Sequence, residues 1–142
     1  MNYQPYLYGA YGSNLDKGQM RDRCPNARPV TSMMLPNWVL RFRGVADIEP
    51  AVAGEVSLGL WQITEECERR LDVYEGYPRL YTKEFLQTDA GLVMVYSMTD
   101  KSDVHPPPNQ YLYGISVGYD HFMLDRDTLT QALKHSYAQQ AT

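Results

Sequence analysis

Two short segments of the sequence contain residue types that could bind an anion or transfer a proton. The first, YGSNL at Tyr11 to Leu15, follows an apolar, aromatic run and precedes a stretch with helical character. A loop at such a strand–helix junction exposes backbone N–H groups, and the helix N-terminus adds partial positive charge. This arrangement suits a carboxylate or a developing oxyanion. The alternative interpretation is a tight turn that binds nothing.

The second segment, LDVYEG at Leu71 to Gly76, places two carboxylates on one face of an expected helix. Asp72 and Glu75 are separated by three positions, so each carboxylate is expected to raise the proton affinity of the other. Glu75 lies in the last turn, where the helix dipole disfavours an anion. A solvated glutamate at a helix end is one interpretation, and a perturbed carboxyl that takes part in catalysis is the other.

Other common catalytic arrangements are missing from the sequence. It contains neither GxxxxGK[ST] nor GxGxxG, so a glycine-rich phosphate loop is not expected. His105, His121 and His135 lie far apart and never at HExxH spacing, so no metal site and no cofactor are expected. Ser13 has no GxSxG context, and Cys24 is interpreted as a small buried hydrophobe rather than a nucleophile.

Composition favours a single globular domain over residues 1–142. The chain has a mass of 16.3 kDa, is 44% apolar and carries a net charge of −4 without a basic cluster, so nucleic acid is not an expected partner. No apolar run approaches the roughly 20 residues that span a bilayer, and the N-terminus lacks a signal-peptide pattern. With only two cysteines, the expected location is the cytoplasm, with no membrane partner.

Hydrophobic patterning predicts an α+β domain that positions the two segments. Strands are expected at residues 6–11, 30–35, 38–43, 54–63, 81–87 and 92–98, with a turn at 47–50. Helices are expected from a cap at Asn14 or Asp16 to about residue 24, at 64–76, at 111–122 and from 125 or 127 onward. Thr64 and Gly76 suit the two ends of the second helix, in which Cys67, Leu71 and Tyr74 share one face. The twelve tyrosines could line a polar pocket or serve ordinary strands.

Taken together, these residues resemble the gamma-glutamylcyclotransferase (AIG2-like) family. The resemblance extends from about residue 6 to residue 133, and its order and spacing agree over that length. It is carried by Ala10 to Leu15, Met20 to Ala27, Gly54 to Val56 with Gly59 to Ile63, Leu71-Asp72 with Glu75-Gly76, Tyr81, and Pro108 to Tyr111 with Gly118-Tyr119.

The resemblance implies a small mixed β-barrel with flanking helices and a metal-independent enzyme. The implied reaction releases 5-oxoproline and a free amine from a small gamma-glutamyl substrate, whose own alpha-amine is the nucleophile. Glu75 matches the general acid/base, and burial together with Asp72 would raise its pKa towards that of the amine. The residues that match the substrate-binding positions are Tyr11, Gly12, Ser13, Asn14, Leu15 and Tyr81.

The resemblance also leaves a second function open, a non-catalytic module on the same fold that binds a ligand or a protein. The presence of glutamate at position 75 favours the enzyme. Loops at residues 43–53 and 100–109 are expected to select the leaving amine. The sequence fixes neither that amine nor the oligomeric state.

Overall fold

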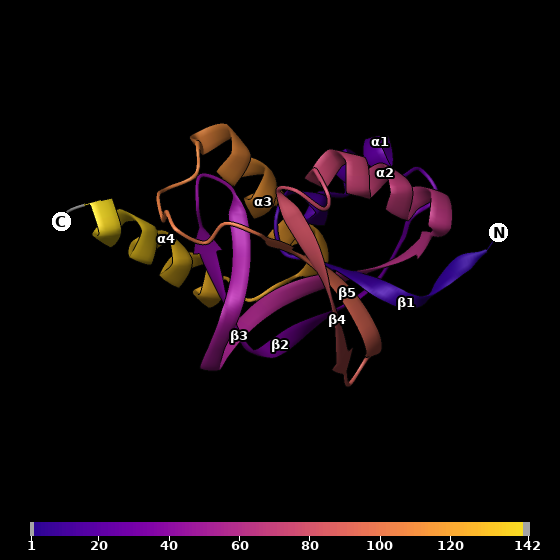
Figure 1. Ribbon diagram of the computed structural model, residues 1–142, viewed down its shortest axis with the longest axis horizontal. Helices are drawn as coiled ribbons and strands as arrows, with labels where there is room; N and C mark the ends of the chain where they lie inside the picture. Colours follow the sequence, from indigo (N-terminus) through magenta and orange to yellow (C-terminus); the bar gives the residue numbers. More distant parts are fainter. Residues whose placement is uncertain (1, 141–142) are drawn as a thin grey trace.

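The computed structural model describes residues 2–140 and has mixed helices and strands, as expected for the α+β class (Figure 1). The strands are β1 (Tyr3–Ala10), β2 (Arg28–Phe42), β3 (Ala46–Thr64), β4 (Tyr81–Thr88) and β5 (Gly91–Met98). The helices are the 3-10 turn η1 (Ser13–Leu15), α1 (Lys17–Arg23), α2 (Glu65–Glu75), α3 (Asn109–Phe122) and α4 (Asp127–Gln140).

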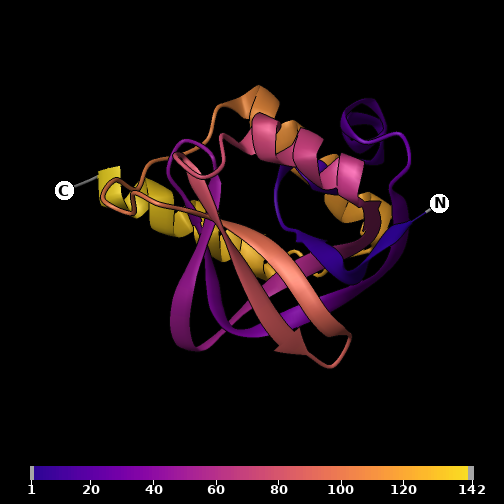
Figure 2. The same cartoon turned by 45° about the vertical axis from the view of Figure 1, so that its right-hand side comes forward.

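One curved sheet organises the molecule, with strand order β2-β3-β1-β5-β4 (Figure 2). The β1–β5 pair is parallel and the other neighbours are antiparallel. The expected barrel is an open sheet instead, because β2 and β4 form its two edges and have no ladder between them within residues 2–140. Side chains from β2 and from the β4–β5 turn line a groove where these edges approach each other.

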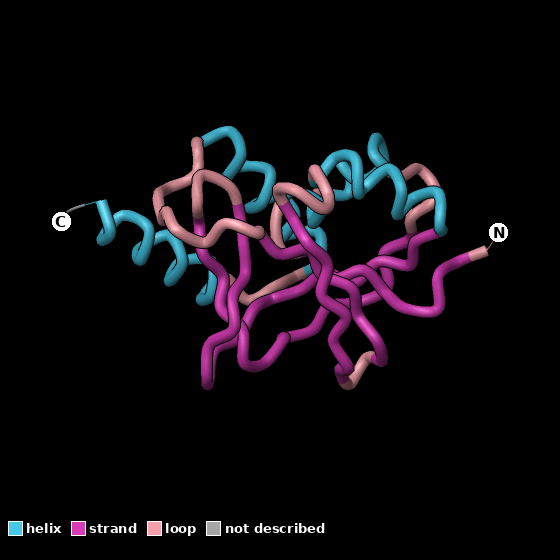
Figure 3. The backbone as a smooth tube through the Cα atoms, viewed as in Figure 1, coloured by secondary structure: helices cyan, strands magenta, loops and turns pink. Residues whose placement is uncertain are grey.

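The long β2–β3 hairpin differs from its sequence-based prediction (Figure 3). The two extended segments expected on either side of Pro36-Asn37 form the single strand β2, and the turn expected at residues 47–50 is part of β3. The register shifts between Pro36 and Trp38, and Asn37 takes a positive φ of 67°, so a bulge accommodates the break without ending the strand. The hairpin turn lies at Gly44, where φ is +80°.

Helix α2 has the ends that the sequence predicts. The Thr64 hydroxyl accepts a hydrogen bond from the Cys67 N–H at 3.1 Å, and Gly76 takes the left-handed conformation that closes the helix. Cys67 and Leu71 are buried as expected, but Tyr74 is 47% exposed. The buried apolar face of α2 is therefore shorter than predicted.

A cysteine pair joins two of the helices. Cys24 at the end of α1 is buried, as expected, but its sulfur forms a disulfide bond with Cys67 of α2. The interpretation of Cys24 as simply a small hydrophobe is thus incomplete, because 43 positions separate the two cysteines and spacing alone cannot pair them. Within residues 2–140, no helix is both long and apolar enough to cross a membrane.

Candidate active site

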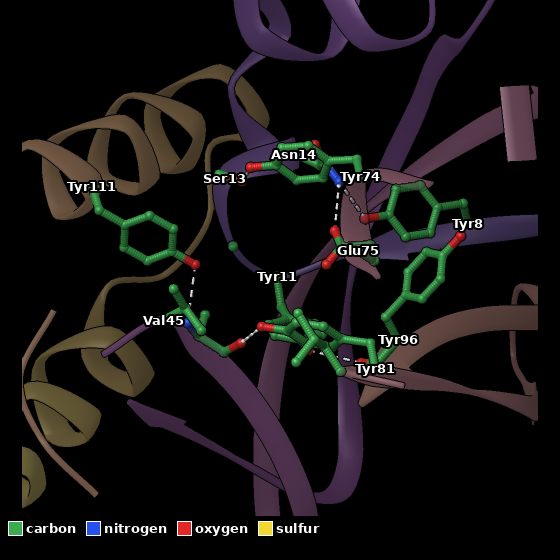
Figure 4. A pocket seen from close by; sticks show the side chains of 13 residues that line it. Tyr8, Tyr11, Ser13, Asn14, Val45, Tyr74, Glu75, Tyr81, Tyr96 and Tyr111 are labelled. Carbon is green, nitrogen blue, oxygen red and sulfur yellow. Dashed lines mark hydrogen bonds between the residues drawn. The ribbon is translucent and has the colours of Figure 1, made fainter. Parts of the chain in front are cut away.

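A cavity of about 290 Å³ lies where the end of β1, the last turn of α2 and the start of β4 meet (Figure 4). Glu75 and the loop residues Gly12, Ser13 and Asn14 form part of its wall. The remaining wall is rich in phenol rings, contributed by Tyr8, Tyr11, Tyr74, Tyr81, Tyr96 and Tyr111. Half of the twelve tyrosines of the sequence therefore surround this one cavity.

Close packing against α3 fixes the position of the loop that follows β1. Leu15 is fully buried, and a Cβ atom on Gly118 of α3 would stand only 2.6 Å from the backbone carbon of Leu15. Glycine at position 118 thus lets α3 approach η1 closely. Leu15 does not line the cavity, so of the expected binding residues it is the one whose side chain has a packing role. Tyr11, Gly12, Ser13, Asn14 and Tyr81 do line it.

Asn14 connects this loop to Glu75. Its side chain is almost fully buried, and its Nδ2 donates hydrogen bonds to the Tyr8 hydroxyl at 2.9 Å and to Glu75 Oε1 at 3.3 Å. The Asn14 backbone oxygen accepts a hydrogen bond from Trp61 Nε1 at 3.1 Å, which anchors the turn to β3. Asp16, rather than Asn14, caps α1 by accepting a hydrogen bond from the Gly18 N–H at 2.9 Å.

Glu75 is the titratable group of the cavity whose pKa falls near neutrality. Burial raises the pKa of its carboxyl from the ordinary value of 4.5 to about 7. The positive charge of Arg23 and the hydrogen bond from Asn14 oppose this shift, because both favour the ionised form. A carboxyl with such a pKa can both accept and return a proton near neutral pH, as a general acid/base must.

Asp72 does not have the role that its spacing suggested. Its carboxylate accepts hydrogen bonds from Lys83 Nζ at 3.0 Å and from the Tyr96 hydroxyl at 2.7 Å. A carboxylate paired with an ammonium group in this way is compensated, and it is not among the causes of the Glu75 shift. The prediction that Asp72 raises the pKa of Glu75 is therefore wrong, and Asp72 instead holds a tyrosine of the cavity wall.

The phenol groups on the far wall hold the β2–β3 turn in place. The Tyr81 hydroxyl donates to the Ala46 carbonyl at 2.7 Å, and the Tyr111 hydroxyl accepts from the Ala46 N–H at 2.9 Å. Burial raises the pKa of both tyrosines, so their hydroxyls stay neutral near pH 7. The sequence did not predict Tyr111 and Ala46 as residues of the site, because their hydrogen bond joins residues 65 positions apart.

The assembled groups can bind an acyl group that carries a negative charge and exchange protons with a nearby nitrogen. The first N–H groups of a helical turn have no partner within that turn, so η1 offers backbone donors in the wall of the cavity that Glu75 also lines. Within residues 2–140, no group of three or more His, Cys, Asp or Glu side chains is placed to hold a metal ion.

Comparison with known proteins identifies the fold. No protein-family model and no curated protein matches the sequence. Among solved structures, a gamma-glutamyl cyclotransferase has a TM-score of 0.76 at 24% identity, covering 89% of this chain and 85% of that one. The uncharacterized human protein loc79017 reaches 0.77 at 25% identity with the same coverage, and a mouse AIG2-like protein 0.59 at 14% identity, over 80% of this chain and 84% of that one.

The chain therefore has the fold of a solved gamma-glutamyl cyclotransferase, which AIG2-like proteins share. The resemblance seen in the sequence is confirmed for the fold.

Proposed function

We propose that this protein is a gamma-glutamyl cyclotransferase that releases 5-oxoproline and a free amine from a small gamma-glutamyl compound. The observation that carries the proposal is Glu75, a carboxyl with a pKa raised to about 7 that faces the Gly12–Asn14 loop across one cavity. The fold, shared with a solved gamma-glutamyl cyclotransferase, supports the same reaction class.

The reaction needs no nucleophile from the protein. The substrate's alpha-amine attacks the carbonyl carbon of its own gamma-amide, a new C–N bond closes the five-membered ring, and the bond to the leaving nitrogen breaks. Glu75 takes one proton from the substrate's ammonium group, which frees the amine to attack, and delivers that proton to the leaving nitrogen. The ring nitrogen loses a second proton as the bond to the leaving nitrogen breaks, and the released amine takes it up. Because the attack is intramolecular, the protein's main task is to hold the folded-back conformer.

The pKa of Glu75 makes this proton transfer efficient. An ordinary glutamate and an alpha-amine of pKa ~8 differ by almost 4 units, which corresponds to about 5 kcal/mol. With the pKa of Glu75 raised to about 7, the mismatch falls to about 1 unit. Burial of the Glu75 carboxyl therefore removes most of the free-energy cost of the proton transfer.

The size and position of the cavity suggest where each part of the substrate binds. A volume of about 290 Å³ is at the small end for ligand pockets and suits the gamma-glutamyl group alone. A second, more open cavity shares Ser13, Tyr74 and Tyr111 with the first and extends to Pro108. We assign the leaving amine to this outer region, where Pro108 belongs to one of the loops expected to select it.

The decisive experiment measures 5-oxoproline release from gamma-glutamyl amino acids, gamma-glutamylamines and glutathione, with EDTA present. Wild type is compared with Glu75→Gln and with Glu66→Gln, a control that makes the same substitution on the exposed side of α2. We expect Glu75→Gln to lower turnover at least a hundredfold and Glu66→Gln to leave it unchanged.

Equal turnover in wild type and Glu75→Gln would remove Glu75 from the mechanism. Binding of 5-oxoproline without turnover of any substrate would instead favour the non-catalytic binding module, with thermal stabilisation by the ligand as the readout.

A further inference from the structure

Arg23 joins three elements around Glu75 without lining the cavity itself. This last residue of α1 donates from Nη1 to Asn14 Oδ1 at 2.6 Å and to Ser13 Oγ at 3.2 Å. Its Nη2 donates to Gln19 Oε1 at 2.8 Å, and its guanidinium carbon lies 3.8 Å from the centre of the Tyr74 ring. One side chain therefore contacts the loop, its own helix and the last turn of α2.

These contacts decide which way the Asn14 amide points. An amide has an acceptor end and a donor end of nearly equal size, so shape alone does not orient it. Arginine has only donors and can therefore pair only with the oxygen end of Asn14. With Oδ1 held by Arg23, Nδ2 is directed towards the Tyr8 hydroxyl and Glu75 Oε1. The reversed amide would place an oxygen against the Glu75 carboxylate.

From this geometry we propose that Arg23 is a positioning residue, which orients the Asn14 amide and through it holds Glu75 in its reactive position. The inference rests on the proposed function for its effect on turnover. The structural part, a chain of contacts from Arg23 through Asn14 to Glu75, does not depend on which substrate is used.

Arg23 also sets the charge balance of the site. Its positive charge lowers the pKa of Glu75 and so limits the increase that burial causes. The other titratable groups that interact with Glu75 are phenols whose own pKa values are raised by burial, and these are Tyr8, Tyr11, Tyr81 and Tyr111. Because these phenols are neutral near pH 7, Arg23 is the cation that keeps part of Glu75 ionised.

Lysine could not make the same set of contacts. The planar guanidinium fork donates to Asn14, Ser13 and Gln19 while its face stacks on Tyr74, whereas an ammonium group is a point charge without a flat face. The backbone that carries Arg23 is also fixed, because the next residue, Cys24, is bonded to Cys67 of α2. The end of α1 is thereby tied to the helix that ends at Glu75.

The first test is the pH dependence of 5-oxoproline release by wild type, Arg23→Gln and Arg23→Lys. The matched control is Arg21→Gln, which removes the other basic residue from the last turn of α1 at an exposed position. We expect Arg23→Gln to lower kcat about tenfold or more, with a smaller change in KM, and to move the acid limb to higher pH. Arg23→Lys should lower kcat but leave the limb near that of wild type.

A purely structural role for Arg23 would reduce the amount of active protein and leave the acid limb in place. An unchanged limb in Arg23→Gln, or an equal shift in Arg21→Gln, would therefore overturn the inference. In an Asn14→Ala background, Arg23→Gln should change kcat little on the pH plateau above the acid limb, because the positioning path from Arg23 to Glu75 runs through Asn14. Full, additive losses from the two substitutions would contradict that path.

The second test does not need turnover and so separates this inference from the proposed function. The carboxyl carbon of Glu75, assigned by its loss in Glu75→Gln, is titrated by ¹³C NMR in the free protein. Arg23→Gln should raise the titration midpoint, while Arg21→Gln should leave it unchanged. If wild type releases no 5-oxoproline, this titration still decides whether Arg23 controls Glu75. If Arg23→Gln does not fold, Arg23→Lys should keep the midpoint near wild type, and a clear increase there would contradict the charge argument.

Discussion

Replacing Glu75 with glutamine should make the protein more stable at pH 8, although the same substitution is expected to lower the proposed turnover at least a hundredfold. The wild-type carboxyl has a pKa of about 7 in the folded state, against an ordinary value of 4.5. The folded state therefore binds more protons than the unfolded state between these two values, and stability falls as pH rises through them. Glutamine has the same shape, carries no charge and can still accept the hydrogen bond from Asn14 at Oε1.

The magnitude follows from the shift itself. The difference between 4.5 and about 7 corresponds to about 3 kcal/mol of free energy of unfolding, lost by wild type once Glu75 is ionised in both states. At pH 8, Glu75→Gln should regain nearly all of this free energy of unfolding. At pH 5 the wild-type carboxyl is already protonated in the folded state, so the substitution should add only about 1 kcal/mol. For a chain of 142 residues, the pH 8 gain corresponds to roughly 10 °C in Tm.

The assay is urea and thermal unfolding of wild type, Glu75→Gln and the exposed control Glu66→Gln at pH 5 and pH 8. The control should change stability by less than about 0.5 kcal/mol at either pH. Glu75→Gln stabilised equally at both pH values would show that the gain does not come from ionisation. Glu75→Gln destabilised at pH 8 would show that the carboxylate is well compensated in the folded state, and the account of its raised pKa would be refuted.

Three further substitutions test other parts of the site. Asp72→Asn should leave the acid limb of the pH–rate profile in place, because Asp72 pairs with Lys83; a limb moved to lower pH would restore the expectation drawn from spacing. Gly118→Ala should cost about 1–3 kcal/mol in urea unfolding and reduce activity, since its Cβ would collide with the backbone of η1. Gly114→Ala on the same helix meets only the end of the Gln19 side chain and should cost less. Thr64→Ala should cost about 1 kcal/mol by removing the cap of α2, and an unchanged urea midpoint would show that this cap contributes nothing.

The sequence by itself determined the features whose causes are local. Thr64 and Gly76 mark the ends of α2 because a cap hydrogen bond and a left-handed glycine act within a few residues of the helix. The hairpin of β4 and β5 follows from two runs of strand-forming residues joined by a short turn that ends at Gly91, where φ is +88°. The YGSNL loop and Glu75 can be recognised as candidate site residues because their residue types and their positions at helix ends are evident without knowledge of their tertiary contacts.

Only the tertiary structure decided which groups act on Glu75. Spacing along α2 pointed to Asp72, but Lys83 and Tyr96 of the sheet donate hydrogen bonds to that carboxylate. Glu75 instead accepts a hydrogen bond from Asn14 and is influenced by the positive charge of Arg23. The same holds for the unbroken strand β2, whose pairing with β3 outweighs the local break at Pro36-Asn37. Burial and long-range hydrogen bonds depend on residues that are distant in sequence, and local residue patterns do not show which of these residues meet in the folded chain.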